Sequence, residues 1–174
     1  MINIYGRKTV TGVCFMAKVI LTCGKICSGK TTYAKKLCAS EKAVLLSVDE
    51  ITLALFGQDA GNEHDRNVAN LKAYLLEKAA ETAGYGINAV CDFGLWSVQE
   101  RKQIREFFSS RGIANEIHYL RISDRARLER ISERNRRIKS GEYHAYIIDE
   151  GLLEKADKLF EAPDEDEVDV IVEA

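Results

Sequence analysis

Residues 24–31 are the stretch of this chain whose residue types and spacing point most directly to chemistry. Their sequence, GKICSGKT, matches the phosphate-binding template G-x-x-x-x-G-K-[ST], known as Walker A, at every fixed position. The two glycines of the template let backbone N–H groups wrap closely around a phosphate chain. The lysine, here Lys30, reaches the β- and γ-phosphate oxygens, and the hydroxyl of Thr31 holds a Mg²⁺ ion.

The segments on either side supply the strand and the helix that this template requires. Residues 19–23 are a short apolar run that predicts a strand. Residues 31–39 contain no Gly or Pro and place their apolar side chains on one helical face. A glycine turn that binds nothing is the less favoured alternative, because both flanks are present. We therefore predict that a nucleotide binds to Gly24, Lys25, Ile26, Cys27, Ser28, Gly29, Lys30, Thr31 and Thr32.

The size and composition of the chain are those of one globular domain. It has 174 residues, of which 46% are hydrophobic and 30% charged. The net charge of −2 lacks the basic excess that marks general nucleic-acid binding. Residues 16–18, Met-Ala-Lys, resemble a natural chain start directly before the first strand. We predict an N-terminal extension over residues 1–15 and a single domain over residues 16–174.

The cysteines and the hydropathy pattern predict a cytoplasmic protein. The chain has five cysteines, an odd number, and two of them lie in or beside the phosphate loop, which does not suggest a disulfide framework. Cys23 and Cys27 have no second Cys or His pair at zinc spacing, so a zinc site is rejected. No apolar run approaches 18 residues, and residues 9–15 are too short and interrupted for a signal peptide. Neither a membrane segment nor an oligomeric state is indicated.

Strand and helix patterns alternate along the rest of the chain. Further strands are expected at residues 43–48, 87–91, 116–122 and 168–172. Helices are expected at residues 51–56, 68–83, 97–110, 124–139 and 149–160, with a polar loop at residues 58–67. This alternation predicts an α/β fold with a parallel sheet and right-handed crossovers, whose ligands bind at the carboxyl ends of the strands.

Two aspartates follow predicted strands and would lie near the phosphate loop. Asp49 could accept the proton of an attacking hydroxyl as a general base or orient the Mg²⁺ shell; its alternative role is the N-cap of a helix over residues 51–56. Asp92 could bind Mg²⁺ through water, or it could be a turn residue before Gly94. We favour function for Asp49 and leave both interpretations open for Asp92.

Three arginines fall on one face of the predicted helix over residues 124–139. Arg130, Arg134 and Arg137 follow i,i+4 and i,i+3 spacing. Such a row can close over a nucleotide as a lid and neutralise the charge that develops during phosphoryl transfer. The alternative is a solvated helix face paired with Glu129 and Glu133. The phosphate loop upstream favours a lid, which we place at about residues 124–147.

Aromatic and histidine residues near these segments allow fewer conclusions. Phe93 and Trp96, the only tryptophan, could line an acceptor pocket or pack at the sheet edge, and packing is favoured. His118 lies inside a predicted strand and is interpreted as structural. His64 and His144 lie in predicted loops and receive no role.

With these motifs in place, residues 17–174 resemble small P-loop kinases of the nucleoside-monophosphate-kinase type. Within that group the chain is most similar to the branch that holds chloramphenicol phosphotransferase, zeta toxins, polynucleotide 5′-kinase domains and AAA-domain ATP-binding predicted kinases. The resemblance rests on the loop at residues 24–31, on Ser-Val-Asp-Glu at residues 47–50, on Asp-Phe-Gly at residues 92–94, on the arginine row and on Phe-Glu-Ala-Pro at residues 160–163.

The resemblance implies a P-loop NTPase fold, with a five-stranded parallel sheet in the order 2-3-1-4-5 flanked by helices and a short helical lid. It implies ATP and Mg²⁺ as cofactors, with Thr31 and Asp92 at the metal and Lys30, Asp49 and Arg134 as catalytic residues. Asp49 matches the general base, and Arg130 matches an arginine that packs near adenine. Arg134 and Arg137 belong to the nucleotide-binding lid, and the loop that ends at Pro163 falls where the family holds the adenine edge.

One departure from the family pattern bears on the substrate. Polynucleotide kinases of this group have an arginine three residues after the aspartate at position 49, whereas this chain has Thr52. Together with the negative net charge, this argues against a nucleic-acid partner and favours a small-molecule hydroxyl acceptor. The leading hypothesis is thus an ATP-dependent phosphotransferase. The alternatives are a nucleotide-binding switch ATPase without an acceptor and a polynucleotide 5′-hydroxyl kinase.

Overall fold

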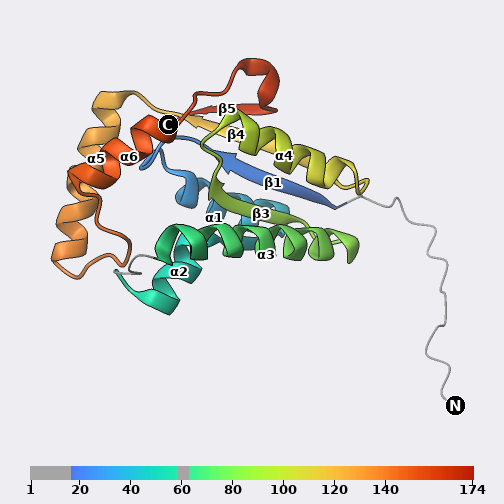
Figure 1. Cartoon of the computed structure of the whole chain (residues 1–174), viewed down its shortest axis with the longest axis horizontal. Coiled ribbons are helices and arrows are strands. Elements are labelled where there is room, and N and C mark those ends of the chain that lie inside the picture. The colour runs from blue at the N-terminus through green and yellow to red at the C-terminus, as the bar shows by residue number, and fades with distance from the viewer. Residues whose placement is uncertain (1–16, 59–62) are drawn as a thin grey trace, which may run out of the picture.

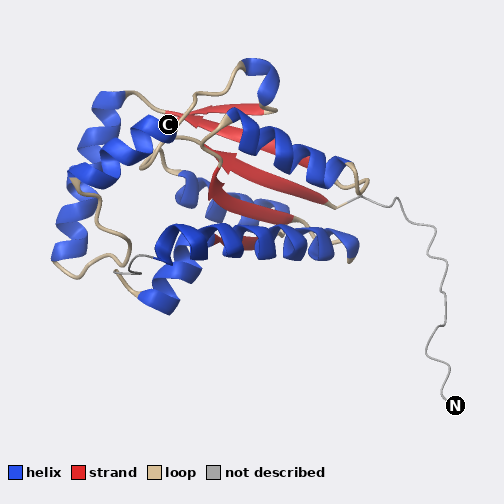
Figure 2. Cartoon of the chain, viewed as in Figure 1, coloured by secondary structure: helices blue, strands red, loops and turns tan. Residues whose placement is uncertain are grey.

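The computed structural model describes residues 17–58 and 63–174. The predicted extension over residues 1–15 therefore lies outside the described residues, as does part of the predicted loop at residues 58–67. Figure 1 shows the arrangement of the helices and strands, and Figure 2 shows the sheet at the centre with helices on both sides.

The sheet has five parallel strands in the order β2-β3-β1-β4-β5, which confirms the predicted topology. The central strand β1 pairs with β3 on one side and with β4 on the other. Because β1 has neighbours on both sides and helices on both faces, its side chains from Val19 to Leu21 are fully buried. The strands are β1 (Lys18–Cys23), β2 (Val44–Ser47), β3 (Ala89–Gly94), β4 (Ala114–Arg121) and β5 (Val170–Glu173).

The helices divide between the two faces of the sheet. Val19 and Leu21 belong to the larger core, which includes Leu75 of α3 and Phe108 of α4. Ile20, which points to the opposite face, packs with Ala34 of α1. The helices are α1 (Lys30–Glu41), α2 (Val48–Phe56), α3 (His64–Gly84), α4 (Val98–Ser109), α5 (Asp124–Lys139) and α6 (Glu150–Leu159), followed by the 3₁₀ turn η2 (Glu165–Glu167).

Three element boundaries differ from those that the sequence predicted. α2 begins at Val48 instead of residue 51, because the Ser47 hydroxyl accepts a hydrogen bond from the Glu50 N–H and caps the helix. Asp49 therefore lies in the first turn and is not the cap. α3 begins at His64, so the predicted loop over residues 58–67 is shorter. β3 extends to Gly94, which places Asp92 inside the strand instead of at its end.

Side chains cap the starts of α4, α5 and α6. The hydroxyls of Ser97 and Ser123 and the carboxylate of Asp149 accept hydrogen bonds from backbone N–H groups in the first turns of these helices. A reciprocal capping box does not form at Ser97. The Glu100 carboxylate accepts from the N–H of Trp96, at 2.9 Å, and not from that of Ser97.

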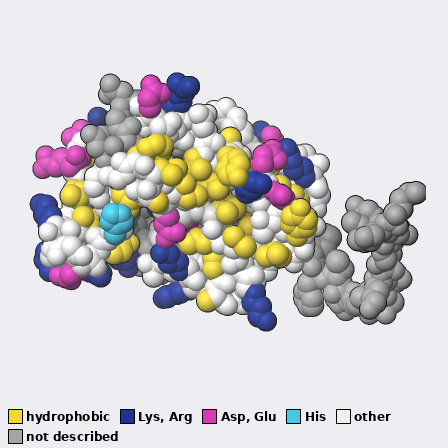
Figure 3. Space-filling model, turned by 90° about the horizontal axis from the view of Figure 1, so that it is seen from below, with side chains coloured by type: hydrophobic (Ala, Val, Ile, Leu, Met, Phe, Trp, Pro, Cys, Tyr) yellow, Lys and Arg dark blue, Asp and Glu magenta, His cyan; other side chains and the backbone are white. Residues whose placement is uncertain are grey.

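Apolar side chains also reach the surface of the molecule. Figure 3 shows hydrophobic side chains on one face, beside a hollow with a histidine at its rim. Among residues 17–58 and 63–174, no helix combines the length and the apolar character needed to cross a membrane. The four described cysteines are free thiols, in agreement with the expectation of no disulfide framework.

Arg101 of α4 connects segments that are distant in the sequence. Its side chain is almost fully buried and donates to Glu167 at 2.7 Å. It also donates to the carbonyl oxygens of Glu161 and Leu95, at 2.9 and 3.3 Å. A buried guanidinium is stable only when it is paired and hydrogen-bonded, and these partners meet that requirement. Arg101 thus fixes the segment between α6 and β5 and the turn after β3.

We predict that Arg101→Ala destabilises the fold by about 3 kcal/mol, because it leaves a carboxylate and two carbonyl oxygens without their donor. Urea unfolding followed by circular dichroism measures the difference. Arg111→Ala is the matched control, since Arg111 is exposed and pairs with Glu77 at the surface. Equal losses of stability in the two variants would show that the Arg101 contacts do not hold these segments.

Candidate functional site

The phosphate loop connects β1 to α1 and has the backbone that its glycines allow. Gly24 has φ 147°, and a Cβ there would lie 2.7 Å from the carbonyl oxygen of Leu120 and 2.8 Å from Ser28 Oγ. Gly29 has φ 98°, in the left-handed region that favours glycine. No other residue type fits at position 24 without displacing backbone, so the template glycine is a packing requirement of the loop.

Lys30, the first residue of α1, is held over the loop by its own backbone. Its Nζ donates to the carbonyl oxygens of Gly24, at 2.9 Å, and Lys25, at 2.8 Å. Burial lowers the pKa of the ammonium below its ordinary value of 10.5, while the carboxylates of Asp92 and Asp49 oppose the shift. The ammonium thus lies over the phosphate loop, where a phosphate oxygen would accept a hydrogen bond from its remaining N–H group.

Thr31 and Asp92 join the phosphate loop to β3. The Thr31 hydroxyl donates to one Asp92 carboxylate oxygen at 2.6 Å, and the buried Thr22 hydroxyl donates to the other at 3.0 Å. The two hydrogen bonds fix the orientation of the carboxylate. A hydroxyl beside a carboxylate forms the all-oxygen set of ligands that Mg²⁺ prefers. Within the described ranges, no group of three or more His, Cys, Asp or Glu side chains could hold a metal ion.

Asp49 lies in the same cavity as Lys30 and Asp92. The residue is exposed and opens onto the cavity, whose walls reduce the water around the carboxyl. Burial raises the pKa of the Asp49 carboxyl above its ordinary value of 3.8, and the nearby Asp92 charge raises it further. The cations Lys30, Arg134 and Lys72 offset part of the shift. A carboxylate whose proton affinity is raised while cations remain nearby is suited to accept a proton.

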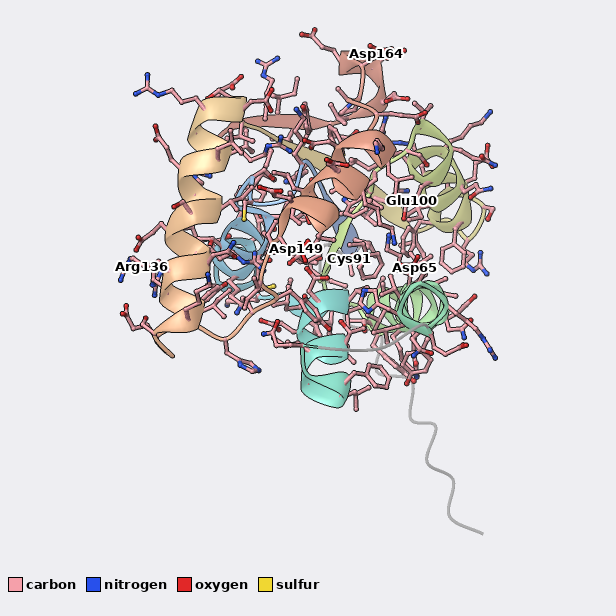
Figure 4. The ribbon with its side chains drawn as sticks, turned by 60° about the vertical axis from the view of Figure 1, so that its left-hand side comes forward. Asp65, Cys91, Glu100, Arg136, Asp149 and Asp164 are labelled. Atoms are coloured by element: carbon pink, nitrogen blue, oxygen red, sulfur yellow. The ribbon has the colours of Figure 1, made fainter. Side chains whose placement is uncertain are left out.

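The predicted lid helix, α5, lies against the phosphate loop. Arg130 Nη1 donates to the carbonyl oxygen of Ser28 at 3.2 Å. Arg134 contacts the Cys27 sulfur at 3.8 Å and donates to the carbonyl oxygen of Tyr146 at 3.1 Å, while its buried Nε has no partner. Arg137 lies 5.3 Å from the centroid of the Tyr143 ring. The three arginines therefore face the cavity, whereas Arg136 points away from it (Figure 4).

All these groups line one cavity of about 1540 Å³. A cavity of this size exceeds the usual volume of a single small-molecule site and leaves room for two ligands. The predicted residues that the structure brings together in it are Ile26, Cys27, Ser28, Gly29, Lys30, Thr31, Thr32, Asp49, Asp92, Arg130, Arg134 and Arg137.

Two predicted loop residues do not line the cavity. Gly24 is buried beneath the loop and contributes its carbonyl oxygen to Lys30. The Lys25 ammonium is turned toward α5, where it pairs with Asp124 at 2.8 Å. Their structural roles are to close the loop and to attach it to the base of α5.

The assignment of Pro163 to the adenine edge remains a prediction. Pro163 does not line the cavity. Glu161, two residues earlier, is hydrogen-bonded to the turn before α4 and to the first residue of that helix. The Glu161 N–H donates to the carbonyl oxygen of Trp96, and its carboxylate accepts from the Val98 N–H. The residues that reach the cavity from this part of the chain are instead Val172 and Ala174, at the carboxyl end of β5.

Sequence reasoning missed several residues of the cavity. Lys72, Tyr146 and Gln58 line it without belonging to any motif. Gln58 joins α2 to the segment before α6, since its amide donates to the Ala145 carbonyl at 2.7 Å and accepts from the Ile147 N–H at 3.3 Å. Phe93 and Trp96 also line the cavity, although packing was the favoured interpretation. The only sequence signal that could have placed Trp96 in the cavity was its position just after the end of a predicted strand.

The predicted histidine roles agree in part with the structure. His118 is buried in β4, where it contacts the Tyr33 hydroxyl at 2.9 Å and Glu116 at 3.0 Å, as expected for a structural residue. His64, to which no role was given, lies at the start of α3 and lines the cavity. Its ring meets that of Tyr146 edge to face, with the centroids 6.0 Å apart.

Solved structures with the same fold include several kinases. The Mycobacterium tuberculosis APS kinase CysC, in complex with AMPPNP and APS, matches with a TM-score of 0.65 and 16% identity over 91% of this chain and 88% of that one. A sugar kinase from Janibacter sp. matches with a TM-score of 0.62 and 16% identity, over 90% and 85%. A gluconokinase from Sinorhizobium meliloti matches with a TM-score of 0.61 and 16% identity, over 91% and 83%. Comparison with curated protein sequences gave no significant match.

The family comparison agrees with the geometry of the site. Residues 19–162 match the family AAA_33, described as an AAA domain, and this range includes the phosphate loop, Asp49, Asp92 and the arginines of α5. The fold is that of small P-loop kinases, as the resemblance of the motifs implied. The chain therefore belongs to the AAA domain family AAA_33 and has the fold of the P-loop kinases.

Proposed function

We propose that this protein is an ATP-dependent phosphotransferase that transfers the γ-phosphate to a hydroxyl group of a small molecule. The observation that carries the proposal is the position of the Asp49 carboxylate in the same cavity as Lys30, the Thr31–Asp92 pair and the arginines of α5. A phosphate loop alone would explain nucleotide binding. A second carboxylate beside the loop, whose pKa is raised, supplies the base that a phosphoryl transfer to a hydroxyl group requires.

The nucleotide is assigned to the part of the cavity between the phosphate loop and α5. The loop N–H groups and the positive end of the α1 dipole attract the phosphate chain. Lys30 and Arg134 contribute positive charge to the transferring group, and Arg130 lies at the loop beside Ser28. Thr31 and Asp92 would hold Mg²⁺, which neutralises phosphate charge when it is bound.

The acceptor is assigned to the side of the cavity where Asp49 lies. In the proposed step, a bond forms between the acceptor oxygen and the γ-phosphorus while the bond from that phosphorus to the β–γ bridging oxygen breaks. The hydroxyl proton passes to Asp49, and ADP leaves. Because the pKa of the Asp49 carboxyl is raised, it takes this proton more readily than a carboxyl at its ordinary value.

Three activities can be separated by experiment. Calorimetry with ATP and with GTP identifies the nucleotide, and a screen of hydroxyl-bearing metabolites for ADP release identifies turnover. A switch ATPase without an acceptor gains no turnover from any metabolite, whereas a polynucleotide kinase labels the 5′-hydroxyl of an oligonucleotide. ADP release that depends on a small-molecule alcohol is the result that the proposal requires.

Lys30→Ala is expected to reduce phosphate transfer at least about a hundredfold, because it removes the cation at the γ-phosphate. The measurement is transfer from γ-labelled ATP to a pool of hydroxyl metabolites. Lys102→Ala, which changes an exposed lysine of α4, is the control and should transfer at the wild-type rate. Transfer that survives in the Lys30 variant would contradict the assignment of the loop.

Asp49→Asn is expected to keep ATP binding but to lose transfer by at least about a hundredfold, because an amide does not accept the hydroxyl proton. Calorimetry gives the ATP affinity, and labelled transfer gives the rate. Glu50→Gln is the matched control, since Glu50 is the neighbouring carboxylate and pairs with Lys35 outside the cavity. Unchanged turnover in the Asp49 variant would exclude Asp49 as the base.

The same Asp49→Asn variant is expected to be more stable than the wild type at pH 7. The pKa of Asp49 is raised in the folded state, so the folded protein binds more protons than the unfolded chain between the ordinary value of 3.8 and the raised value. Stability of the wild type therefore falls as pH rises through this window, and the advantage of the variant disappears below pH 3.8. Urea unfolding at a series of pH values tests this, and an advantage that is independent of pH would contradict it.

A further inference from the structure

The acceptor side of the cavity has a distinct set of charges. We call it the acceptor wall and define it as the cavity-lining residues of α2, α3, the β3–α4 turn, the segment between α5 and α6, and α6 itself. The cations in this wall are Lys72 of α3 and Lys155 of α6. Asp65 of α3 and Asp149 at the start of α6 also line the cavity, and Glu100 lies on the neighbouring helix α4 (Figure 4).

Both lysines of the acceptor wall are already paired with carboxylates. Lys72 donates to Glu100 at 2.6 Å, and both side chains of this pair are about three-quarters buried. Lys155 donates to the two oxygens of Asp65 at 2.9 and 2.8 Å. The buried Lys72 offers little to an anionic ligand, which would have to displace Glu100. The Lys155–Asp65 pair is exposed and weaker, but the Asp65 carboxylate still offsets the lysine charge.

The remaining ionised groups of the wall are negative. Asp49 and Asp149 line it and form no ion pair with any other described residue. Asp149 accepts a hydrogen bond from the Leu152 N–H, which caps α6 but does not cancel its charge. A carboxylate or phosphate group on an acceptor would therefore meet two like charges in this wall, whose two lysines are already paired. The cations that reach the wall from α5, Arg134 at the Tyr146 carbonyl and Arg137 over the Tyr143 ring, lie on the side of the cavity assigned to the nucleotide.

Trp96 provides an apolar surface in the same wall, and its backbone is held on both sides. Its N–H donates to Glu100 at 2.9 Å, and its carbonyl oxygen accepts from the Glu161 N–H at 2.8 Å. The two residues before it, Gly94 and Leu95, both have positive φ, at 88° and 45°. A Cβ on Gly94 would lie 2.8 Å from the indole Nε1, so the ring packs directly over this glycine.

The strained turn therefore fixes the indole in position before any ligand binds. A non-glycine residue such as Leu95 adopts positive φ only where its surroundings enforce it, and such strain is frequent at binding sites. Leu95 is fully buried, and its carbonyl oxygen accepts from Arg101 and from the Cys23 thiol. Tyr146 and His64 add a second aromatic pair to the lining.

We propose that the acceptor is an alcohol without an anionic group, whose apolar or aromatic body packs against Trp96. This inference rests on the proposed function and narrows its substrate class. It separates the protein from kinases whose acceptors carry a carboxylate or a phosphate, because both lysines of the acceptor wall are already paired with carboxylates.

Fluorescence of the single tryptophan measures this binding directly and needs neither nucleotide nor turnover. Three probes share a benzylic alcohol and differ in charge: 1-phenylethanol is neutral, 2-amino-1-phenylethanol is cationic and mandelate is anionic. Each is titrated into the full chain with excitation at 295 nm, which selects tryptophan. We expect 1-phenylethanol and the amine to bind at least about tenfold more tightly than mandelate. Gluconate serves as an anionic probe without a ring and is expected not to bind.

A variant at Glu100 is expected to weaken the preference against anionic probes, and it tests whether the Lys72–Glu100 pair causes that preference. Glu100→Gln keeps an oxygen for the Trp96 N–H but removes the charge that pairs with Lys72. We expect mandelate to bind this variant at least about fivefold more tightly than the wild type, with 1-phenylethanol unchanged. Glu77→Gln is the control, because Glu77 pairs with Arg111 on the surface and should leave all affinities as they were.

The outcomes separate this inference from the proposed function. Binding of mandelate or gluconate to the wild type as tight as that of 1-phenylethanol overturns the inference, and so does a titration in which no probe changes the fluorescence. Either result leaves the phosphotransferase proposal to be tested by labelled transfer. A preference for the uncharged and cationic probes that Glu100→Gln weakens supports the inference, even in a preparation that shows no transfer.

Discussion

The close packing of the backbone at Gly24 is the constraint on which the rest of the site depends. A side chain at this position would collide with the Leu120 carbonyl at the end of β4, and the Gly24 N–H donates to the Gly94 carbonyl at 3.2 Å. The phosphate loop is thereby fixed between the ends of two neighbouring strands. Since Gly94 begins the turn that carries Trp96, one backbone junction positions both the phosphate side and the acceptor side of the cavity.

The surroundings of Asp49 and Lys30 in this cavity disfavour their charged forms. Burial raises the pKa of Asp49 and lowers that of Lys30, so each group is less easily charged in the folded protein than in the unfolded chain. The fold tolerates this because other buried charges, such as Arg101 and Arg127, have carboxylate partners. The cost in stability falls on Asp49 and Lys30, the residues for which we propose a catalytic role, as is common in active sites.

Much of the fold was predictable because its elements are defined by local patterns. Each strand is a short apolar run, and α4, α5 and α6 start where Ser97, Ser123 and Asp149 accept hydrogen bonds from the residues that follow. The start of α2 was placed three residues too late because Val48 continues an apolar run and reads as strand. Only the contact between Ser47 and the Glu50 N–H decides the boundary. The sheet order came from the resemblance and not from any local pattern.

The part of the site formed by the phosphate loop and the arginines of α5 was also predictable, because template spacing and helical periodicity are both local. The position of Pro163 relative to the cavity could not be read from local sequence, because it depends on Glu161 bonding to Trp96 and Val98, more than sixty residues earlier in the chain. Pairs that define the acceptor wall are equally distant in sequence, with Lys72 bonded to Glu100 and Lys155 bonded to Asp65. No window of the sequence contains both members of such a pair.

This distance explains why the proposed acceptor class is argued from contacts in the structure and could not be argued from the sequence. A count of charges along the chain shows basic residues and carboxylates in similar numbers, 25 Lys and Arg against 27 Asp and Glu, and it would allow an anionic substrate as readily as a neutral one. Discrimination depends on which cations remain free after folding, since a buried and paired ammonium has little attraction left for a ligand. In this cavity Arg130 and Arg134 contact the phosphate loop, while the lysines of the acceptor wall are paired with carboxylates of the protein itself. Positive charge is thus available where a triphosphate would lie and is neutralised where the acceptor would lie.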